Sequence, residues 1–298
     1  MKSNIFDNMK RWIFLLVVLF SIPLFFSCED EDDTIQEPSL IIKFQFDPNQ
    51  VRLNNLGQPA TIPAGHAAQS PDFSKISAHY FELAPNANTQ LGQGAILFRA
   101  DETTQGGAVA IDFSKAVIVG EGEAFLRIPL SQVNQGSYEY VRVSLAYQEY
   151  TISVRNAGND YLGKLASFVG YNTYITTHSI GNNAFPVNGN RLQGYWAFAL
   201  NDFPYATSGQ APAGATTVPN PIAATSPIPA GSCVVTGKFA QNLIITGNET
   251  RDITVTLSLS CNNSFEWEEV TADGKYEPSI GENVVDMGLR GLIPTYVR

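Results

Sequence analysis

The sequence has few of the residues and none of the local motifs that usually carry catalysis. It holds three histidines and three cysteines among 298 residues. It lacks a Gly-x-Ser-x-Gly nucleophile elbow, a His-Glu-x-x-His zinc motif, a phosphate-binding P-loop and a Gly-x-Gly-x-x-Gly dinucleotide motif. The chain is therefore predicted not to be an enzyme. A glycan-active hydrolase with dispersed carboxylates stays open as an alternative, because such carboxylates need not be close in sequence.

Charge is scarce as well, and basic residues are fewer than acidic ones. Only 15% of residues are charged, and the formal net charge is −10. Proteins bind nucleic acid by neutralising phosphates with lysine and arginine, so nucleic acid is not expected as a partner. Long hydrophobic runs are also missing, because the apolar segment 12–26 is shorter than the roughly twenty residues that a membrane-spanning helix needs.

The first 27 residues have the layout of a signal peptide. Three basic residues precede the apolar segment 12–26, and Ser27-Cys28 follows it. Through Phe25-Phe26-Ser27-Cys28 this start resembles the bacterial lipoprotein signal, although the commonest motif has leucine in place of Phe25. The resemblance implies cleavage before Cys28 and acylation of Cys28, which would anchor the chain in a lipid bilayer. A plain secretory signal and an uncleaved anchor are the alternatives.

Residues 28–38 are predicted to be a flexible acidic tether. Five consecutive acids, residues 29–33, follow Cys28. They resemble the acidic export signal of surface lipoproteins of the Bacteroidota type, which implies an outer-membrane location facing outward at the cell surface. A solvated spacer is the alternative interpretation. Asp33-Thr34-Ile35 also fits a short O-glycosylation motif of the same group, which makes Thr34 a candidate glycosylation site.

Two cysteines remain if Cys28 carries lipid. Cys233 and Cys261 are then an even pair in an oxidising compartment, which predicts a disulfide. Such a bond would stabilise the fold by roughly 3 to 4 kcal/mol in the chain-entropy model. The alternative is a pair of buried thiols on neighbouring strands.

Residues 39–298 are predicted to form an antiparallel β-sandwich, immunoglobulin-like or jelly-roll-like. Apolar residues alternate with polar ones near residues 42–46 and strictly over 253–261, whereas no segment after the signal has a helical period. Residues 138–154 alternate too, but their apolar positions change from odd to even numbers. This change predicts a β-bulge near Gln148-Glu149.

Residues 203–232 are predicted to be a long proline-rich loop within the domain, since six prolines there remove hydrogen-bond donors from the backbone. A linker to a C-terminal hairpin module is the alternative. A loop of this length is often functional.

The three histidines, His66, His79 and His178, are candidate metal ligands if the fold brings at least two of them together. The opening strand, residues 75–83 and Gly194-Tyr195-Trp196-Ala197-Phe198 resemble the MbnP-like family. This resemblance implies an exported β-sandwich accessory protein that handles copper, but it assigns no ligand position. The ordinary interpretation is three unrelated histidines and no cofactor.

Aromatic residues are the other candidates for binding. Trp196 is expected in the core, because it shares a strand face with Phe198 and Leu200. The alternative is that Tyr195, Trp196 and Trp267 bind a ligand, since aromatic faces suit sugar rings. The acidic tail around Trp267 has enough carboxylates to attract Ca²⁺, but its spacing fits no calcium loop and solvated acids are the default.

The sequence as a whole thus predicts a membrane-anchored, surface-exposed lipoprotein whose β domain binds a ligand or partner without catalysis. The expected partner is a small ligand, a glycan or an outer-membrane protein.

Overall fold

The computed structural model describes residues 37–53, 58–211, 226–229 and 231–298. Strands dominate these residues, and their helical segments are single 3-10 turns at Phe113–Lys115, Leu130–Gln132 and Pro278–Ile280. No helix in the described ranges is both long and apolar enough to cross a bilayer. The prediction of an all-β fold is confirmed. The predicted signal peptide, Cys28 and Thr34 lie outside the described residues.

One layer of the fold is a four-stranded sheet, the β1 sheet, with the order β18-β15-β1-β7. Its strands are β1 (Ser39–Asp47), β7 (Ala124–Pro129), β15 (Ile253–Ser260) and β18 (Arg290–Val297). Alternate residues are fully buried, such as Ile42 and Phe44 in β1 and Val255 and Leu257 in β15. The alternation in the sequence therefore predicted both strands. The β1–β15 pair is parallel, unlike the antiparallel arrangement predicted, because β15 reaches β1 after a long excursion of the chain through the other sheets.

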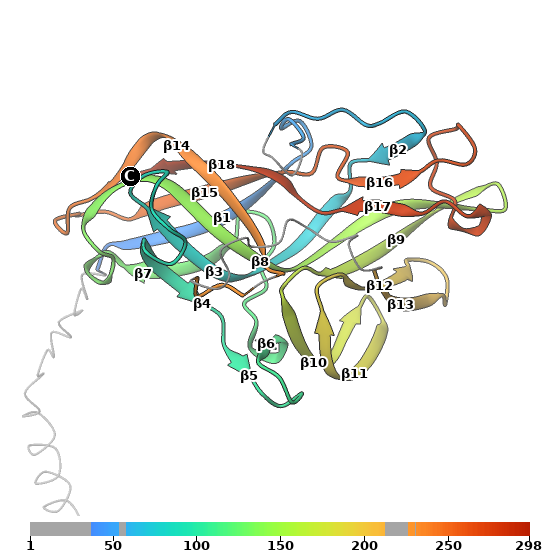
Figure 1. Cartoon of the computed structure of the whole chain (residues 1–298), viewed down its shortest axis with the longest axis horizontal. Helices are drawn as coiled ribbons and strands as arrows, with labels where there is room; N and C mark the ends of the chain where they lie inside the picture. Colours follow the sequence, from blue (N-terminus) through green and yellow to red (C-terminus); the bar gives the residue numbers. More distant parts are fainter. Residues whose placement is uncertain (1–36, 54–57, 212–225, 230) are drawn as a thin grey trace, which may run out of the picture. The chain divides into compact units, whose positions relative to one another are not determined.

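The facing layer is a seven-stranded sheet, the β8 sheet, with the order β13-β12-β9-β8-β3-β4 and with β14 also paired to β8. All of its pairs are antiparallel. Its strands are β3 (Asp72–Ala84), β4 (Ala95–Arg99), β8 (Gly136–Asn156), β9 (Asn159–Phe168), β12 (Tyr195–Leu200), β13 (Ala206–Gln210) and β14 (Cys233–Ile245). The long strand β8 runs through the middle of the molecule in Figure 1.

The change of parity within β8 is a real bulge, as predicted. Tyr147 pairs with Ser77 and Leu145 pairs with Ala78, so Ala146 has no partner residue in β3. The bulge lies slightly before the expected Gln148-Glu149. On its two sides the same face of β8 stays inward, because Leu145 and Tyr150 both belong to the main core.

The main core lies between the inner faces of the β1 and β8 sheets, which confirms the β-sandwich. It includes Phe44 and Leu257 from the first sheet and Phe81 and Tyr150 from the second, all of them almost completely buried. Burial of each such side chain contributes roughly 1.5 to 3 kcal/mol.

Two small sheets complete the fold. The β16 sheet contains β17 (Val284–Met287), β16 (Phe265–Glu268) and β2 (His66–Gln69), and the β10 sheet contains β11 (Asn183–Leu192), β10 (Asn172–Ile180), β6 (Ala110–Asp112) and β5 (Glu102–Thr103).

The β10 sheet covers the outer face of β8, β9 and β12 (Figure 1). A second hydrophobic cluster joins them, with Ile175 of β10 packed among Tyr147, Phe168 and Tyr195. In the β8 sheet these last three side chains point away from the main core, because they alternate with residues that face it. The strand β12 therefore has apolar residues on both faces, and its outer face supports the β10–β11 hairpin.

The predicted disulfide between Cys233 and Cys261 is wrong. The two residues lie on different sheets: Cys233 begins β14 and pairs with Leu145 of β8, whereas Cys261 follows β15 in the β1 sheet. Both cysteines are buried and no disulfide joins them. Burial raises the pKa of the Cys261 thiol to about 11, which keeps it protonated and unreactive. The prediction rested on the even number of cysteines, which does not tell whether the fold brings two of them together.

Part of the proline-rich segment 203–232 is regular rather than a loop. Residues Ala206–Gln210 form β13, which pairs with β12. Residues 212–225 and Ala230 lie outside the described ranges. Beyond them β14 returns to pair with β8, so the last third of the chain contributes to the same sheet as β12 and β13.

Candidate functional site

A cleft of about 450 Å³ lies between the β10–β11 hairpin and the β12–β13 hairpin. Three strands line it. The residues are Pro186, Val187, Asn190, Arg191 and Leu192 of β11, Tyr195 of β12, and Ser208, Gly209 and Gln210 of β13. The lining thus combines an apolar wall with amides, a hydroxyl group, a buried aromatic residue and one cation.

A β-bulge in β11 lets residues from both of its halves line the cleft. Thr177 of β10 pairs with Pro186 and Ile175 pairs with Gly189, so two residues of β11 lie opposite one residue of β10. The second of these, Asn188, has a φ of 49°. Asparagine tolerates this left-handed conformation better than other residues with side chains, glycine apart. The bulge changes the direction in which the following side chains point.

Tyr195 forms the floor of the cleft and is held on several sides. It is 5% exposed. Its ring centroid lies 5.4 Å from that of Phe168 and 5.9 Å from that of His178. The guanidinium carbon of Arg191 lies 5.3 Å from the centroid of the same ring, which is within the range of a cation–π contact. The phenol is thus a fixed platform for the arginine.

His178 lies beneath this floor, in an aromatic environment. It stacks on Phe185 with ring centroids 5.0 Å apart, and Phe168 contacts its ring edge-on. Within the described part of the chain neither ring nitrogen has a hydrogen-bond partner. Burial lowers the pKa of His178 to about 4, although the negative charge of Glu149 opposes this shift. The residue is therefore a neutral core histidine near pH 7.

Trp196 does not line the cleft, because it lies on the other face of β12. The structure buries Tyr195, Ala197 and Ala199, whereas Trp196 and the two residues that share its face are half-buried. The indole of Trp196 covers Gly209 of β13, where an added Cβ would lie 2.7 Å from the ring. Trp196 was expected in the core, but it is only half-buried, because the β10 sheet covers the other face of β12.

The two remaining histidines each contact a different glutamate. His66 of β2 contacts Glu266 with Nδ1 and Oε1 2.5 Å apart, and Glu266 also pairs with Arg52. His79 of β3 is completely buried, and its Nε2 lies 3.1 Å from Glu102. Burial lowers the pKa of His79, and the contact with Glu102 only partly offsets this effect.

The three histidines therefore belong to three different sheets and have different neighbours. The described residues contain no group of three or more histidine, cysteine or carboxylate side chains that could hold a metal ion. The structure does not bring His66, His79 and His178 together into one metal site.

Trp267 is a core residue and offers no face to a ligand. It is 0% exposed, and its ring centroid lies 6.0 Å from that of Phe265 and 5.5 Å from that of Tyr276. A sugar-stacking platform needs an accessible ring face, so the candidate role of Trp267 in ligand binding is wrong.

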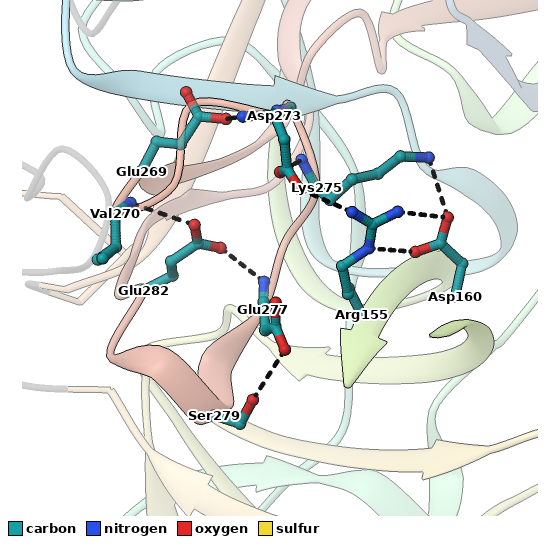
Figure 2. A network of polar contacts seen from close by, with 10 residues as sticks. Arg155, Asp160, Glu269, Val270, Asp273, Lys275, Glu277, Ser279 and Glu282 are labelled. Carbon is teal, nitrogen blue, oxygen red and sulfur yellow. Dashed lines mark hydrogen bonds and ion pairs between the residues drawn. The ribbon is translucent and has the colours of Figure 1, made fainter. Parts of the chain in front are cut away.

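Carboxylates of the acidic tail after Trp267 take part in a network of polar contacts within the protein, as Figure 2 shows. Arg155 donates to Asp160 at 2.8 Å and to Asp273 at 2.7 Å, and Lys275 pairs with Asp160 at 3.1 Å. The buried carboxylate of Glu282 accepts backbone N–H groups from Val270 at 3.1 Å and Glu277 at 2.6 Å. Glu269 accepts those of Asp273 and Gly274 in the same way. These carboxylates stabilise the 269–282 loop and do not form a calcium loop.

The sequence predicted a binding role for Tyr195, which lines the cleft, but did not single out Arg191. No local pattern marked Arg191, because Asn188-Gly189-Asn190-Arg191 reads as a polar turn. The cleft forms only when two hairpins that pair with different strands lie side by side.

A comparison with protein-family models, curated proteins and solved structures finds no match to this sequence.

Proposed function

We propose that this protein is a membrane-anchored, surface-exposed lipoprotein whose β domain binds a small polar ligand without catalysis. The acylated Cys28 and the acidic tether would present the domain at the outer membrane, facing outward. The observation that carries the binding function is the cleft between the β10–β11 and β12–β13 hairpins.

The size and composition of the cleft support a binding site for a small molecule. Such sites usually measure about 300 to 1,000 Å³ and combine apolar walls with a few polar groups that fix the orientation of the ligand. Here Val187 and Leu192 supply apolar surface, while Arg191 and Gln210 supply polar groups.

The lining favours binding over hydrolysis. Hydrolysis of a glycoside uses a pair of carboxyl groups on either side of the scissile bond. The nine residues that line the cleft include no carboxylate, histidine or cysteine. The cleft can thus position a ligand through hydrogen bonds and charge, but its lining has no general acid and base pair.

The framework of the cleft supports selective binding, because it is fixed before a ligand arrives. β12 is paired on both sides, with β9 and with β13, and Tyr195 packs against Phe168. A preorganised site loses less conformational entropy when it binds.

Filling the cleft tests the proposal. Ser208 is exposed, lies on an edge strand and lines the cleft, so Ser208→Trp should fill the space without disturbing the core. The purified chain would be titrated by calorimetry with a panel of neutral, amino and acidic monosaccharides and disaccharides. We expect at least one panel member to bind, and Ser208→Trp to weaken its affinity at least tenfold.

Ala206→Trp is the matched control. Ala206 lies two residues away on the same face of β13, is exposed and does not line the cleft, so its variant should bind like the wild type. Binding that survives Ser208→Trp, or a panel without any binder, would refute the proposed function.

A further inference from the structure

Arg191 differs from most arginines of this protein in its ion pairing. Among the arginines whose side chains the structure describes, six others form an ion pair with a carboxylate: Arg52, Arg99, Arg127, Arg142, Arg155 and Arg298. No described carboxylate lies within 4.0 Å of the Arg191 guanidinium, although the chain has 28 acidic residues against 18 basic ones. Arg251 also has no such partner among the described residues, but its side chain is exposed to water, whereas Arg191 is half-buried in the cleft wall.

The orientation of the Arg191 guanidinium is fixed by two contacts. Its Nη1 donates to the backbone carbonyl of Asn190 at 3.0 Å, and its carbon lies over the Tyr195 ring. A guanidinium has five N–H donors in a planar fork, so several remain for a ligand. This fork matches the two oxygens of a carboxylate, which it can bind through two parallel hydrogen bonds.

The polar residues opposite Arg191 are suited to hydroxyl groups. The Nε2 of Gln210 donates to the backbone carbonyl of Gln193 at 2.8 Å, which leaves its Oε1 as an acceptor at the cleft. Ser208 adds a hydroxyl that can donate or accept. A ligand that fits both sides carries one anionic group and several hydroxyl groups.

The geometry points to a carboxylated sugar, of the hexuronic acid class, as the ligand of the cleft. The Arg191 guanidinium binds the carboxylate, and Gln210 and Ser208 bind ring hydroxyl groups. The apolar wall formed by Pro186, Val187 and Leu192 contacts the C–H face of the sugar ring. This inference rests on the proposed binding function and adds the chemical class of the ligand.

Phosphate fits the same cation less well. Proteins hold phosphate with several cations or with backbone N–H groups from a helix N-terminus, whereas this cleft offers one guanidinium on strands. A dianion is also repelled more strongly than a monoanion by a chain with a formal net charge of −10.

Matched pairs of sugars test the inference. Glucuronate with glucose, galacturonate with galactose, and mannuronate with mannose differ within each pair only in the carboxylate. Calorimetric titration of the purified chain should show at least tenfold tighter binding of one uronate than of its neutral partner. Arg191→Gln should remove this preference, and Arg191→Lys should restore only part of it, because lysine cannot bind a carboxylate with a planar fork.

Arg251→Gln is the matched control, because it removes an exposed arginine that has no ion pair and lies outside the cleft lining. Its uronate affinity should equal that of the wild type. Three results would overturn this inference: equal affinity for uronate and neutral sugar, tighter binding of inorganic phosphate than of uronate, or no uronate binding. The proposed function would survive each result if Ser208→Trp still abolished binding of another panel member, and it would fall if no binding depended on Ser208.

Discussion

Single residues of the second hydrophobic cluster link the stability of the cleft to pH. His178 is buried among Phe168, Phe185 and Tyr195, without a partner for either ring nitrogen in the described part of the chain. A protonated imidazolium would be costly there, because its charge would lose hydration without gaining a hydrogen bond. The same residue supports the Tyr195 floor, so protonation of His178 would disturb the cleft from below.

We predict that His178 makes the fold less stable in acid. Its pKa is about 4 in the folded protein, against the ordinary histidine value of 6.5, so the unfolded chain binds more protons between these pH values. The stability from neutral His178 is therefore present above about pH 6.5 and is lost as the pH falls toward 4. The loss amounts to at most about 3 kcal/mol. Urea unfolding at pH 7.0 and pH 4.5 measures it.

His178→Phe gives the comparison, because phenylalanine keeps the aromatic contacts and cannot be protonated. The variant should lose less stability than the wild type between pH 7.0 and pH 4.5. Carboxylates and His79 titrate in both proteins. The difference between the two proteins in the stability that each loses from pH 7.0 to pH 4.5 therefore reports His178. An identical loss of stability in the two proteins would mean that His178 is already protonated or is hydrated in the fold.

Residue by residue, the sequence indicated the chemistry of the candidates but not their surroundings. It marked Trp267 as an aromatic between acids, yet the indole is buried in the main core. It also marked Tyr195 as a candidate ligand-binding residue, and the ring of Tyr195 lines the cleft. Both side chains have the same local alternation, so only the packing of other strands over them decides which one a ligand can reach.

At the level of elements, irregularities in the strands shape the site. The β11 bulge contains Asn188 with a positive φ and precedes Asn190 and Arg191 in the cleft wall. A bulge adds one residue to a strand and so changes which of the following residues point to a given face. The second bulge, at Ala146 of β8, marks the place where β8 changes its partner on one side from β14 to β9.

We predict that Asn188 is replaceable by glycine and not by a β-branched residue. Asn188→Gly should leave the free energy of unfolding unchanged or raise it slightly, because glycine adopts a φ of 49° without strain. Asn188→Val should lower it by about 1 to 2 kcal/mol. Chemical denaturation monitored by tryptophan fluorescence would measure both effects.

Ala184→Val on the same strand is the control, since Ala184 is exposed and has no positive φ. Its effect should stay within about 0.5 kcal/mol. If Asn188→Val were equally harmless, the bulge would not depend on a left-handed residue.

The bulge in β8 could be predicted from the sequence, whereas the one in β11 could not. In β8 the long apolar alternation makes a change of parity visible. In β11 the apolar alternation is limited to Phe185 and Val187 and is followed by the polar residues around Asn188, so it is too short to reveal a change of parity.

At the scale of the whole molecule, the N-terminal segment is expected to determine where the β domain acts. Cleavage and acylation at Cys28 would attach the domain to a membrane through a tether of about ten residues. Each buried acyl CH₂ group contributes about 0.8 kcal/mol of membrane affinity, so two or three chains give stable anchoring. The acidic tether and the acidic domain add no electrostatic attraction to anionic lipids.

We predict that Cys28→Ala abolishes the lipid anchor. The variant should lose palmitate labelling and leave the membrane fraction, whereas Ser27→Ala should keep both, since alanine is also a small residue before the cysteine. Protease treatment of whole cells should remove the wild-type protein if it faces outward. Membrane retention of Cys28→Ala would contradict lipidation, and protection from protease until the outer membrane is broken would place the domain on the periplasmic side.

The sequence by itself determined that the part of the chain described by the structure is all-β, and approximately where its most regular strands and the β8 bulge lie, because side-chain alternation is a local property. The tertiary structure alone decided that Cys233 and Cys261 belong to different sheets, that the three histidines are not gathered into one metal site, and that Arg191 stands beside Tyr195 in a cleft. Strand order and sheet packing bring residues together that are far apart in the sequence. No local sequence pattern shows which of these residues become neighbours in space.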